Sequence, residues 1–204
     1  MTDTLHHLKI ALKNVRPTVV REVLVPSTLR LDRLHAVIQT AMGWGDVHMH
    51  EFIVGTLRDG ERFGTPTPDV FAVGSPTRNE KKFTLRQAAP AKGSKFVYWY
   101  DFGDDWYHDI SVKAVVEVIP DLPVPYCLKA SRACPPEDCG GPGGYANLLA
   151  ILADPTHEEH ADMCDWIGEP FDPEAVDVDL INEGLWTLAR DWNRPPSKRK
   201  PTSR

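Results

Sequence analysis

The segment from residue 96 to residue 119 constrains the fold most strongly, because its large side chains alternate along the chain. Aromatic residues occupy every second position at its start: Phe96, Tyr98, Tyr100 and Phe102. Gly103-Asp104 supplies turn chemistry, and the alternation resumes after Trp106. Two runs with a period of two, separated by a turn, predict a β-hairpin. Since one face of each run is apolar, the hairpin predicts an antiparallel sheet with one buried face.

Three strands and one helix are predicted before this hairpin, and the third strand covers residues 48–54. Residues 8–12 and 19–25 have the alternation or β-branched content of strands. The period changes at residues 31–42, where Leu, Ile, Ala and Met residues form one helical stripe that Gly43 ends. Residues 55–94 mix glycine, proline and charge and predict an irregular connection with a short helix at its end.

The C-terminal part has a different character. Residues 120–144 contain six prolines and four glycines and predict an ordered, irregular loop. Helices are predicted beyond it: one ending at Asp154-Pro155, one from the capping box Thr156–Glu159 to Ile167, one starting at Asp172-Pro173-Glu174, and one over 180–188. The fold class is therefore α+β, with the N-terminal-half helix packed on the sheet and a helical, loop-rich C-terminal part. We expect one domain over residues 1–193 and a basic, disordered tail over 194–204.

Charge is distributed unevenly along the chain. Residues 1–100 contain 14 Lys and Arg against 9 Asp and Glu, whereas residues 101–183 contain 3 against 19. Residues 184–204 are basic again, with 6 against 1, so the formal net charge of −6 averages three different regions. The acidic region argues against phosphate contact and favours a basic protein, a cationic ligand or a metal. Nucleic acid is expected only at the N-terminal half or the tail.

The compartment is predicted from what the sequence lacks. No apolar run approaches the ~20 residues of a membrane span, and the N-terminus has no basic segment followed by an apolar one. The chain has four cysteines. Without an export signal, these features predict a cytoplasmic protein with reduced thiols and no membrane contact.

The first candidate site combines His48, His50, Asp101 and His108, with Asp104 and Asp105 beside them. Residues 48–54 alternate like a strand, which places the two neighbouring histidines on one face. Such a cluster can hold a metal or perform general acid–base chemistry. The alternative is structural: His108 is a hydrogen-bonded core residue, and Asp104 caps the turn.

The second candidate site is a set of sulfur and imidazole ligands. Its members are Cys127, Cys134, Cys139, His157, His160 and Cys164, and the last three fall on one stripe of a predicted helix. Cysteine and histidine are the usual ligands of structural zinc. The spacing lacks the C-x2-C pair of zinc knuckles. The alternative is that Cys164 packs as a small apolar residue beside Trp166.

A third feature is the glycine-rich string from Cys139 to Tyr145, which leads into a helix. A helix N-terminus of this kind can receive a phosphate or carboxylate. However, no Lys or Arg lies nearby, and Glu137 and Asp138 would repel an anion. Tight turning of the chain is the expected purpose of these glycines.

Several long strings carry a resemblance to a known family. They are Leu34–Trp44 with His48–Phe52, Tyr98–His108, Arg132–Gly141 with Gly144-Tyr145, and Asp154–His160. Together they resemble the plasmid pRiA4b ORF-3-like family over about residues 5–190. The resemblance implies an α+β domain, found in bacteria, archaea and on plasmids, without an established activity. Some relatives carry the label of a transposon resolvase, TnpR.

The residues do not support resolvase catalysis. A serine recombinase needs an N-terminal Tyr-x-Arg-x-Ser setting, whereas the first tyrosine here is Tyr98. A tyrosine recombinase uses a His-x-x-Arg pair, and none of the eight histidines has an arginine three residues later. We therefore expect a non-enzymatic binding or interaction module associated with mobile elements. The alternatives are a metal-dependent enzyme that uses the His/Asp cluster, with zinc as a candidate cofactor, and a DNA-associated accessory protein.

Overall fold

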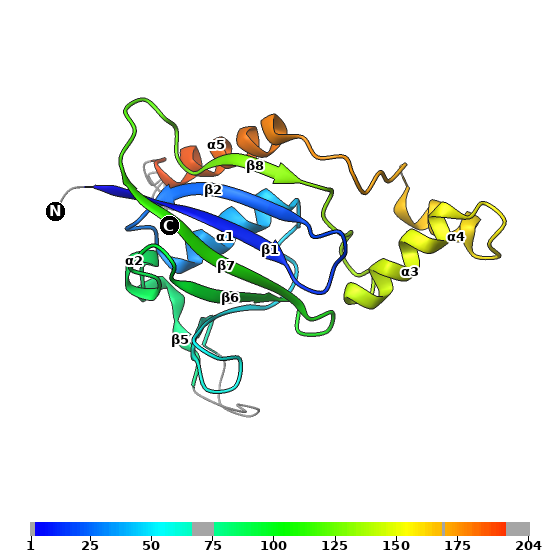
Figure 1. Cartoon of the computed structure of the whole chain (residues 1–204), viewed down its shortest axis with the longest axis horizontal. Helices are drawn as coiled ribbons and strands as arrows, with labels where there is room; N and C mark the ends of the chain where they lie inside the picture. The colour runs from blue at the N-terminus through cyan, green and yellow to red at the C-terminus, as the bar shows by residue number, and fades with distance from the viewer. Residues whose placement is uncertain (1–2, 67–75, 169, 195–204) are drawn as a thin grey trace, which may run out of the picture.

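The computed structural model describes residues 3–66, 76–168 and 170–194 and contains one eight-stranded sheet (Figure 1). The strand order is β5-β4-β3-β6-β7-β1-β2-β8. The strands are β1 (Thr4–Leu12), β2 (Val20–Pro26), β3 (His50–Val54), β4 (Glu61–Gly64), β5 (Arg78–Asn79), β6 (Lys95–Tyr100), β7 (Trp106–Glu117) and β8 (Tyr126–Ser131). All neighbours are antiparallel except β4 and β5, which are parallel. The predicted α+β class is confirmed.

Helices cover one face of this sheet and extend beyond one end of it (Figure 1). They are α1 (Leu31–Met42), α2 (Leu85–Ala88), α3 (Gly141–Ala153), α4 (His160–Ile167) and α5 (Val178–Trp192), with a 3-10 turn at Glu80–Lys82. The α5 helix packs against α1 and β8, while α3 and α4 contact each other and project away from the strands. In the described part of the chain, no helix has the length and apolar character needed to cross a membrane.

The core lies between α1 and the strands. The apolar stripe of α1 contributes Leu31, Leu34 and Ile38, all fully buried, and β1 contributes Leu8 and Ile10 from the facing side. The periodicities of 3.6 and 2 in these segments place their apolar side chains on the two surfaces that meet. The α1 helix ends at Gly43, whose φ of 92° suits a residue without a Cβ.

The aromatic hairpin formed as predicted from the alternation. Tyr98 pairs with His108, and Tyr100 pairs with Trp106. The Tyr98 hydroxyl accepts a hydrogen bond from Gln39 of α1, so the even-numbered residues of β6 face this helix. The remaining residues of β6 face the opposite side of the sheet, which no helix covers in Figure 1.

Three predicted elements differ from the structure. Residues 126–131 form β8 rather than loop, because pairing with β2 supplies hydrogen bonds that a local pattern does not reveal. The α4 helix begins at His160, since the Thr156 hydroxyl donates to Asp154 instead of capping a helix. Asp172-Pro173-Glu174 does not start a helix, because Asp177 accepts the first free N–H groups of α5 five residues later.

The β3 strand begins at His50, so His48 precedes the strand instead of sharing its face. Of the predicted tail, residues 195–204 lie outside the described residues.

Candidate cation site

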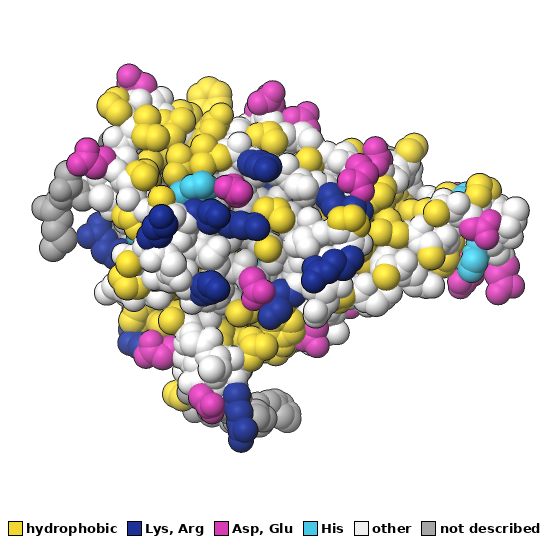
Figure 2. All heavy atoms as spheres, in the orientation of Figure 1, with side chains coloured by type: hydrophobic (Ala, Val, Ile, Leu, Met, Phe, Trp, Pro, Cys, Tyr) yellow, Lys and Arg dark blue, Asp and Glu magenta, His cyan; other side chains and the backbone are white. Residues whose placement is uncertain are grey.

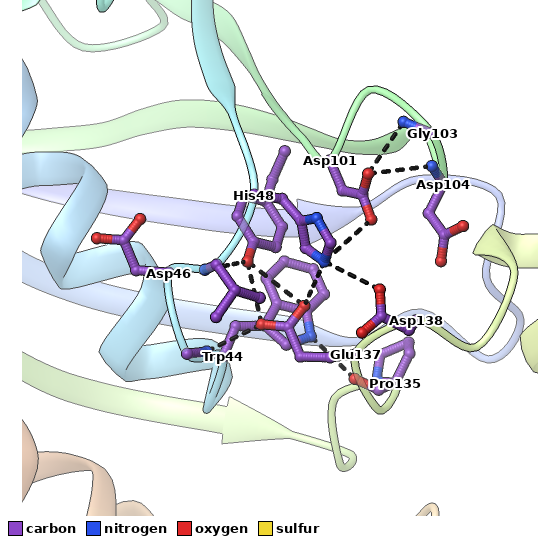
Figure 3. Close-up of polar contacts among 12 residues, drawn as sticks. Trp44, Asp46, His48, Asp101, Gly103, Asp104, Pro135, Glu137 and Asp138 are labelled. Atoms are coloured by element: carbon purple, nitrogen blue, oxygen red, sulfur yellow. Dashed lines mark hydrogen bonds and ion pairs between the residues drawn. The ribbon is translucent and has the colours of Figure 1, made fainter.

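Three loops converge beside the C-terminal end of α1: the loop that follows α1, the β6–β7 turn, and the loop that precedes α3 (Figure 3). The Trp44 indole Nε1 donates to the carbonyl of Pro135 over 2.9 Å and ties the first loop to the third. The Gly140 backbone N–H donates to Asp104 Oδ2 over 3.0 Å and ties the third to the turn. These bonds join positions far apart in sequence and set the geometry of the side chains between them.

His48 lies at the centre of this convergence, with three carboxylates around its Nε2 atom (Figure 3). The distance from Nε2 is 3.0 Å to Asp138 Oδ1, 3.6 Å to Asp101 Oδ2 and 3.9 Å to Glu137 Oε2. Although Asp138 is close enough for an ion pair, its direction of approach does not satisfy hydrogen-bond geometry. The Nε2 atom is buried and has no hydrogen-bond partner among the described residues.

Asp101 and Glu137 are held in place by hydrogen bonds to the carboxylate oxygen that does not face His48. Asp101 Oδ1 accepts from the Gly103 backbone N–H over 2.9 Å, which leaves Oδ2 directed at His48. Glu137 Oε1 accepts from the Gly45 N–H over 2.9 Å and from the Tyr100 hydroxyl over 3.0 Å. Burial, reinforced by the negative charge of Glu137, raises the pKa of Tyr100, so this hydroxyl stays a donor. The protein thus orients these oxygens before any ligand arrives.

The cluster has an excess of negative charge. The ion-pair contacts of Asp101, Glu137 and Asp138 with described residues are all to His48, and none is to Lys or Arg. A neutral imidazole leaves the three charges uncompensated, and a protonated one compensates a single charge. Such an arrangement attracts cations.

The backbone at two of these carboxylates is unusual. Asp101 has a φ of 55° and Asp138 a φ of 57°, in the left-handed region that residues other than glycine seldom enter. Aspartate tolerates this region better than most residues, because its short side chain bonds locally. Strained backbone positions are concentrated at functional sites.

His50 belongs to a second group, formed with His35 of α1. The two imidazole rings stack in parallel, with centroids 3.5 Å apart and an interplanar angle of 3°. His50 Nε2 lies 2.9 Å from Glu80 Oε2, and His35 Nε2 lies 2.7 Å from Asp46 Oδ1. A carboxylate only accepts, so each of these nitrogens carries a proton.

The polar atoms of this second group already satisfy one another. With its proton on Nε2, a neutral His35 accepts at Nδ1 from the Tyr98 hydroxyl, 2.7 Å away. Tyr98 in turn accepts from Gln39, and the Gln39 carbonyl oxygen accepts from the Asp46 backbone N–H. Burial, followed by the neighbouring His50, lowers the pKa of His35 and keeps the ring neutral. A metal would have to break this ring of hydrogen bonds, whereas at His48 it would complete an unsatisfied set.

An open pocket of ≈ 440 Å³ connects the two groups. His35, His48 and His50 line it together with Asp46 and Glu80. The predicted first site is therefore divided: His48 and Asp101 meet in one cluster, and His50 lies in the other.

His108 lies in the core, away from both groups. Its side chain is fully buried, and its Nδ1 donates to the Trp106 carbonyl over 3.1 Å. The Trp44 ring contacts it edge-on at 5.3 Å. Burial lowers the pKa of His108 to about 4, so the ring is neutral at physiological pH. The structural alternative for this residue agrees with its position.

The six cysteine and histidine candidates do not assemble into one ligand set. Among the described residues, the groups of three or more ligand atoms within 4.8 Å of one another contain none of these six. Cys127 is buried in β8, where its thiol contacts the Lys129 carbonyl at 3.5 Å. Cys164 and His160 contact each other on α4, with sulfur 3.8 Å from Nδ1, and His157 lies before that helix. Burial raises the pKa of Cys134 and Cys139, which disfavours the thiolates that zinc requires.

The glycine-rich string allows two backbones to approach closely. A Cβ at Gly141 would collide with the carbonyl of Asp104, and one at Gly144 would collide with the carbonyl of Cys139. Gly141 also has a φ of 68°. Gly141 therefore brings the start of α3 against the β6–β7 turn and helps to place Asp138 beside His48, whereas Gly144 permits the tight local turn after Cys139.

Comparisons with known proteins agree with this fold. The family model for plasmid pRiA4b ORF-3-like proteins matches residues 4–180. The chain belongs to the plasmid pRiA4b ORF-3-like family. Within it, the chain is 39% identical over 196 residues to the uncharacterized protein y4hQ of Sinorhizobium fredii, covering 95% of this chain and 97% of that protein. The crystal structure of MM3350 from Methanosarcina mazei Go1, a protein of unknown function, is similar with a TM-score of 0.75 and 30% identity, covering 88% of this chain and 97% of that one.

Sequence reasoning did not assign Glu137 and Asp138 to the site of this family member. Both stand in a proline- and glycine-rich loop, between Pro136 and Cys139. Adjacent acidic residues in such a loop were a signal, but nothing local indicated which part of the chain they face. His35 and Glu80 of the second group were missed for the same reason.

Proposed function

We propose that the protein is a binding module that holds a divalent cation with His48, Asp101 and Asp138. The single observation that carries the proposal is the buried Nε2 atom of His48, which has no hydrogen-bond partner in the described part of the chain and faces carboxylate oxygens 3.0, 3.6 and 3.9 Å away. A bound cation would satisfy the nitrogen and the negative charges together.

The spacing of the donor atoms supports this proposal. Two ligands bound to one tetrahedral zinc at about 2.0–2.1 Å lie about 3.3 Å apart. The contacts of His48 Nε2 with Asp138 and Asp101, at 3.0 and 3.6 Å, bracket this separation. All three donor atoms lie within 4.8 Å of one another. Glu137, at 3.9 Å from Nε2, would be a fourth ligand or an anchor for metal-bound water.

The donor types indicate the kind of cation. One imidazole with two or three carboxylates suits Zn²⁺ or Mn²⁺, whereas Mg²⁺ and Ca²⁺ prefer oxygen ligands alone. Binding, rather than catalysis, is the proposed role, because the other candidates for acid–base or nucleophilic chemistry are hydrogen-bonded to one another, buried in the core or held as a neutral thiol. His108 is in the core, and the nearby thiol of Cys139 has its pKa raised to about 12 by burial and the charge of Asp104. An association with mobile elements is part of the proposal only through the family description.

The test is metal binding by the untagged, full-length protein after chelation and dialysis. Isothermal titration with Zn²⁺ and Mn²⁺ should give one site per chain. The variant Asp101→Asn/Asp138→Asn removes two charges, but asparagine preserves the local hydrogen bonds and tolerates a positive φ. We expect at least a tenfold loss of affinity.

Asp105→Asn is the matched control. Asp105 lies in the same turn with a φ of 56°, but it bonds the Trp99 indole and does not contact His48. It should bind metal like the wild type. Absence of stoichiometric binding in the wild type, or equal affinity in the double variant, would refute the proposal.

A further inference from the structure

The opposite side of the sheet has a different chemistry from the candidate cation site. We call the uncovered side of the strands the open face; its basic residues are Lys9, Lys95, Lys113 and Lys129. Ser111 of β7 pairs with Lys95 on one side and with Lys9 on the other, so the two lysines flank one strand. Figure 2 shows Lys and Arg side chains gathered over the strands in this view.

Charge on the open face is unbalanced in favour of cations. Two of its carboxylates pair with cations other than these four lysines: Glu51 contacts Arg62 at 2.6 Å, and Asp109 contacts Lys13 at 3.3 Å. Glu22 contacts His7 at 2.8 Å and lies between Lys9 and Lys129 in the strand register, so it offsets part of the lysine charge. The four lysines of the open face form no ion pair with any described residue. Although the net charge of the chain is −6, the lysines of this surface outnumber the carboxylate beside them, so the surface carries an excess of positive charge.

Aromatic rings lie at one end of the same face. Trp99 of β6 stacks on Tyr107 of β7, with centroids 5.2 Å apart and an interplanar angle of 15°. Phe102 contacts Trp99 at 4.2 Å and is itself 38% exposed. The Trp99 indole donates to Asp105 over 3.0 Å, which fixes its orientation. The rings form a rigid, partly exposed platform.

An open pocket of ≈ 430 Å³ lies between the lysines, lined by Lys9, Lys95, Val97, Asp109 and Ser111 among others. Lys9 and Lys95 are two strands apart, about 10 Å across the sheet. Trp99 is four residues beyond Lys95 on the same strand, about 13 Å along it. These dimensions suit a segment of roughly four nucleotides, the lower end of the single-strand site sizes known for small domains.

We propose that the open face binds single-stranded nucleic acid. Lysines neutralise backbone phosphates, and exposed aromatic rings on a sheet stack with unpaired bases. A duplex cannot use such rings, because its bases are stacked internally. The inference is independent of the cation site, which lies on the α1 side of the sheet.

The test is fluorescence anisotropy with labelled oligo-dT and oligo-U of twelve nucleotides at several salt concentrations. With three or four phosphate contacts, the logarithm of the association constant should fall with log[salt] with a slope of about −2 to −3. Lys9→Ala/Lys95→Ala should reduce this slope by about 1.4. Trp99→Ala should weaken binding at least fivefold without changing the slope. The two oligonucleotides distinguish DNA from RNA as the source of the strand.

Lys82→Ala, on the 3-10 turn outside the open face, is the matched control and should bind like the wild type. Circular dichroism verifies that each variant is folded. No binding at low salt, or equal weakening by Lys82→Ala, would overturn the proposal. Tighter binding of duplex DNA or heparin that Trp99→Ala leaves unchanged would also overturn it, since the face would then act as a general polyanion surface.

Discussion

Lowering the pH should destabilise the protein through His108, and the size of the effect follows from its position. The ring is fully buried, its Nδ1 donates to the Trp106 carbonyl, and its Nε2 has no partner among the described residues. Protonation would place a positive charge and an unpaired N–H in the core. The pKa is therefore lowered from 6.5 to about 4 by burial.

The sign and the pH range follow from proton linkage. The unfolded chain takes up a proton near pH 6.5, whereas the folded protein does so only near pH 4. The contribution of the neutral His108 ring to the free energy of unfolding is fully present above pH 6.5 and is lost as the pH falls toward 4. pH 5 lies about 1.5 pH units below the pKa of the unfolded chain, which corresponds to a loss of about 2 kcal/mol in the free energy of unfolding. For a protein of this size, that loss lowers the Tm by about 4–8 °C.

The measurement is the free energy of unfolding in urea at pH 7.5 and at pH 5.0, for the wild type and for His108→Asn. Asparagine keeps a donor toward the Trp106 carbonyl but does not titrate. The two proteins share His6 and His35, whose pKa values burial also lowers, so the comparison cancels their contribution.

We expect the wild type to lose about 2 kcal/mol more than His108→Asn over this pH change. An equal loss in both proteins would refute the reasoning. It would mean that His108 titrates in the folded state as it does in the unfolded chain, and a role in acid–base catalysis would again be open.

Two other predictions concern the glycine-rich string and the thiols. Gly144→Ala should destabilise the protein by roughly 1–3 kcal/mol or more, because its Cβ would collide with the Cys139 carbonyl. Gly143→Ala, with no atom within 4 Å of the new Cβ, should be neutral or stabilising by about 0.5–1 kcal/mol in the same thermal unfolding assay; equal effects would contradict the steric argument. In thiol titration of the native protein at pH 8, the exposed Cys164 should react first, and Cys164→Ser should remove this reaction. Cys139, whose pKa is raised to about 12, should react only after unfolding, and rapid reaction of Cys139 in the native state would show that its loop opens.

Local patterns were sufficient for the elements that carry their own periodicity. The α1 helix spans residues 31–42 as its stripe predicts, and the β6–β7 hairpin follows from alternating aromatic residues. They were insufficient for β8, which is stabilised by pairing with β2, and for the start of α4. For β8 the hydrogen bonds come from a strand about 100 residues earlier, outside any local window. For α4 the competing bond is local, from the Thr156 hydroxyl to Asp154, and the capping-box pattern does not distinguish the two alternatives.

The candidate cation site was likewise predicted in part from local sequence and in part missed, because some of its residues are far apart in the chain. The sequence indicated His48 and Asp101 as chemically suited residues, but spacing grouped them with His50 and His108. The hairpin register places His108 in the core. The His50 ring stacks on the ring of His35, a residue of α1, and so lies in the second group. The place beside His48 is taken by Asp138, which is 90 positions later in the chain.

Side-chain types and local periodicity were enough to predict the α+β class, the main helix, the hairpin and the concentration of negative charge after residue 100. Each of these depends on side-chain type and on short-range period, which are properties of neighbouring residues. Which carboxylates surround His48, and which lysines share the open face, became visible in the folded chain alone. Those groupings depend on strand order and on the close approach of the Gly141 backbone to Asp104, and such contacts between distant segments leave no periodic trace in the sequence.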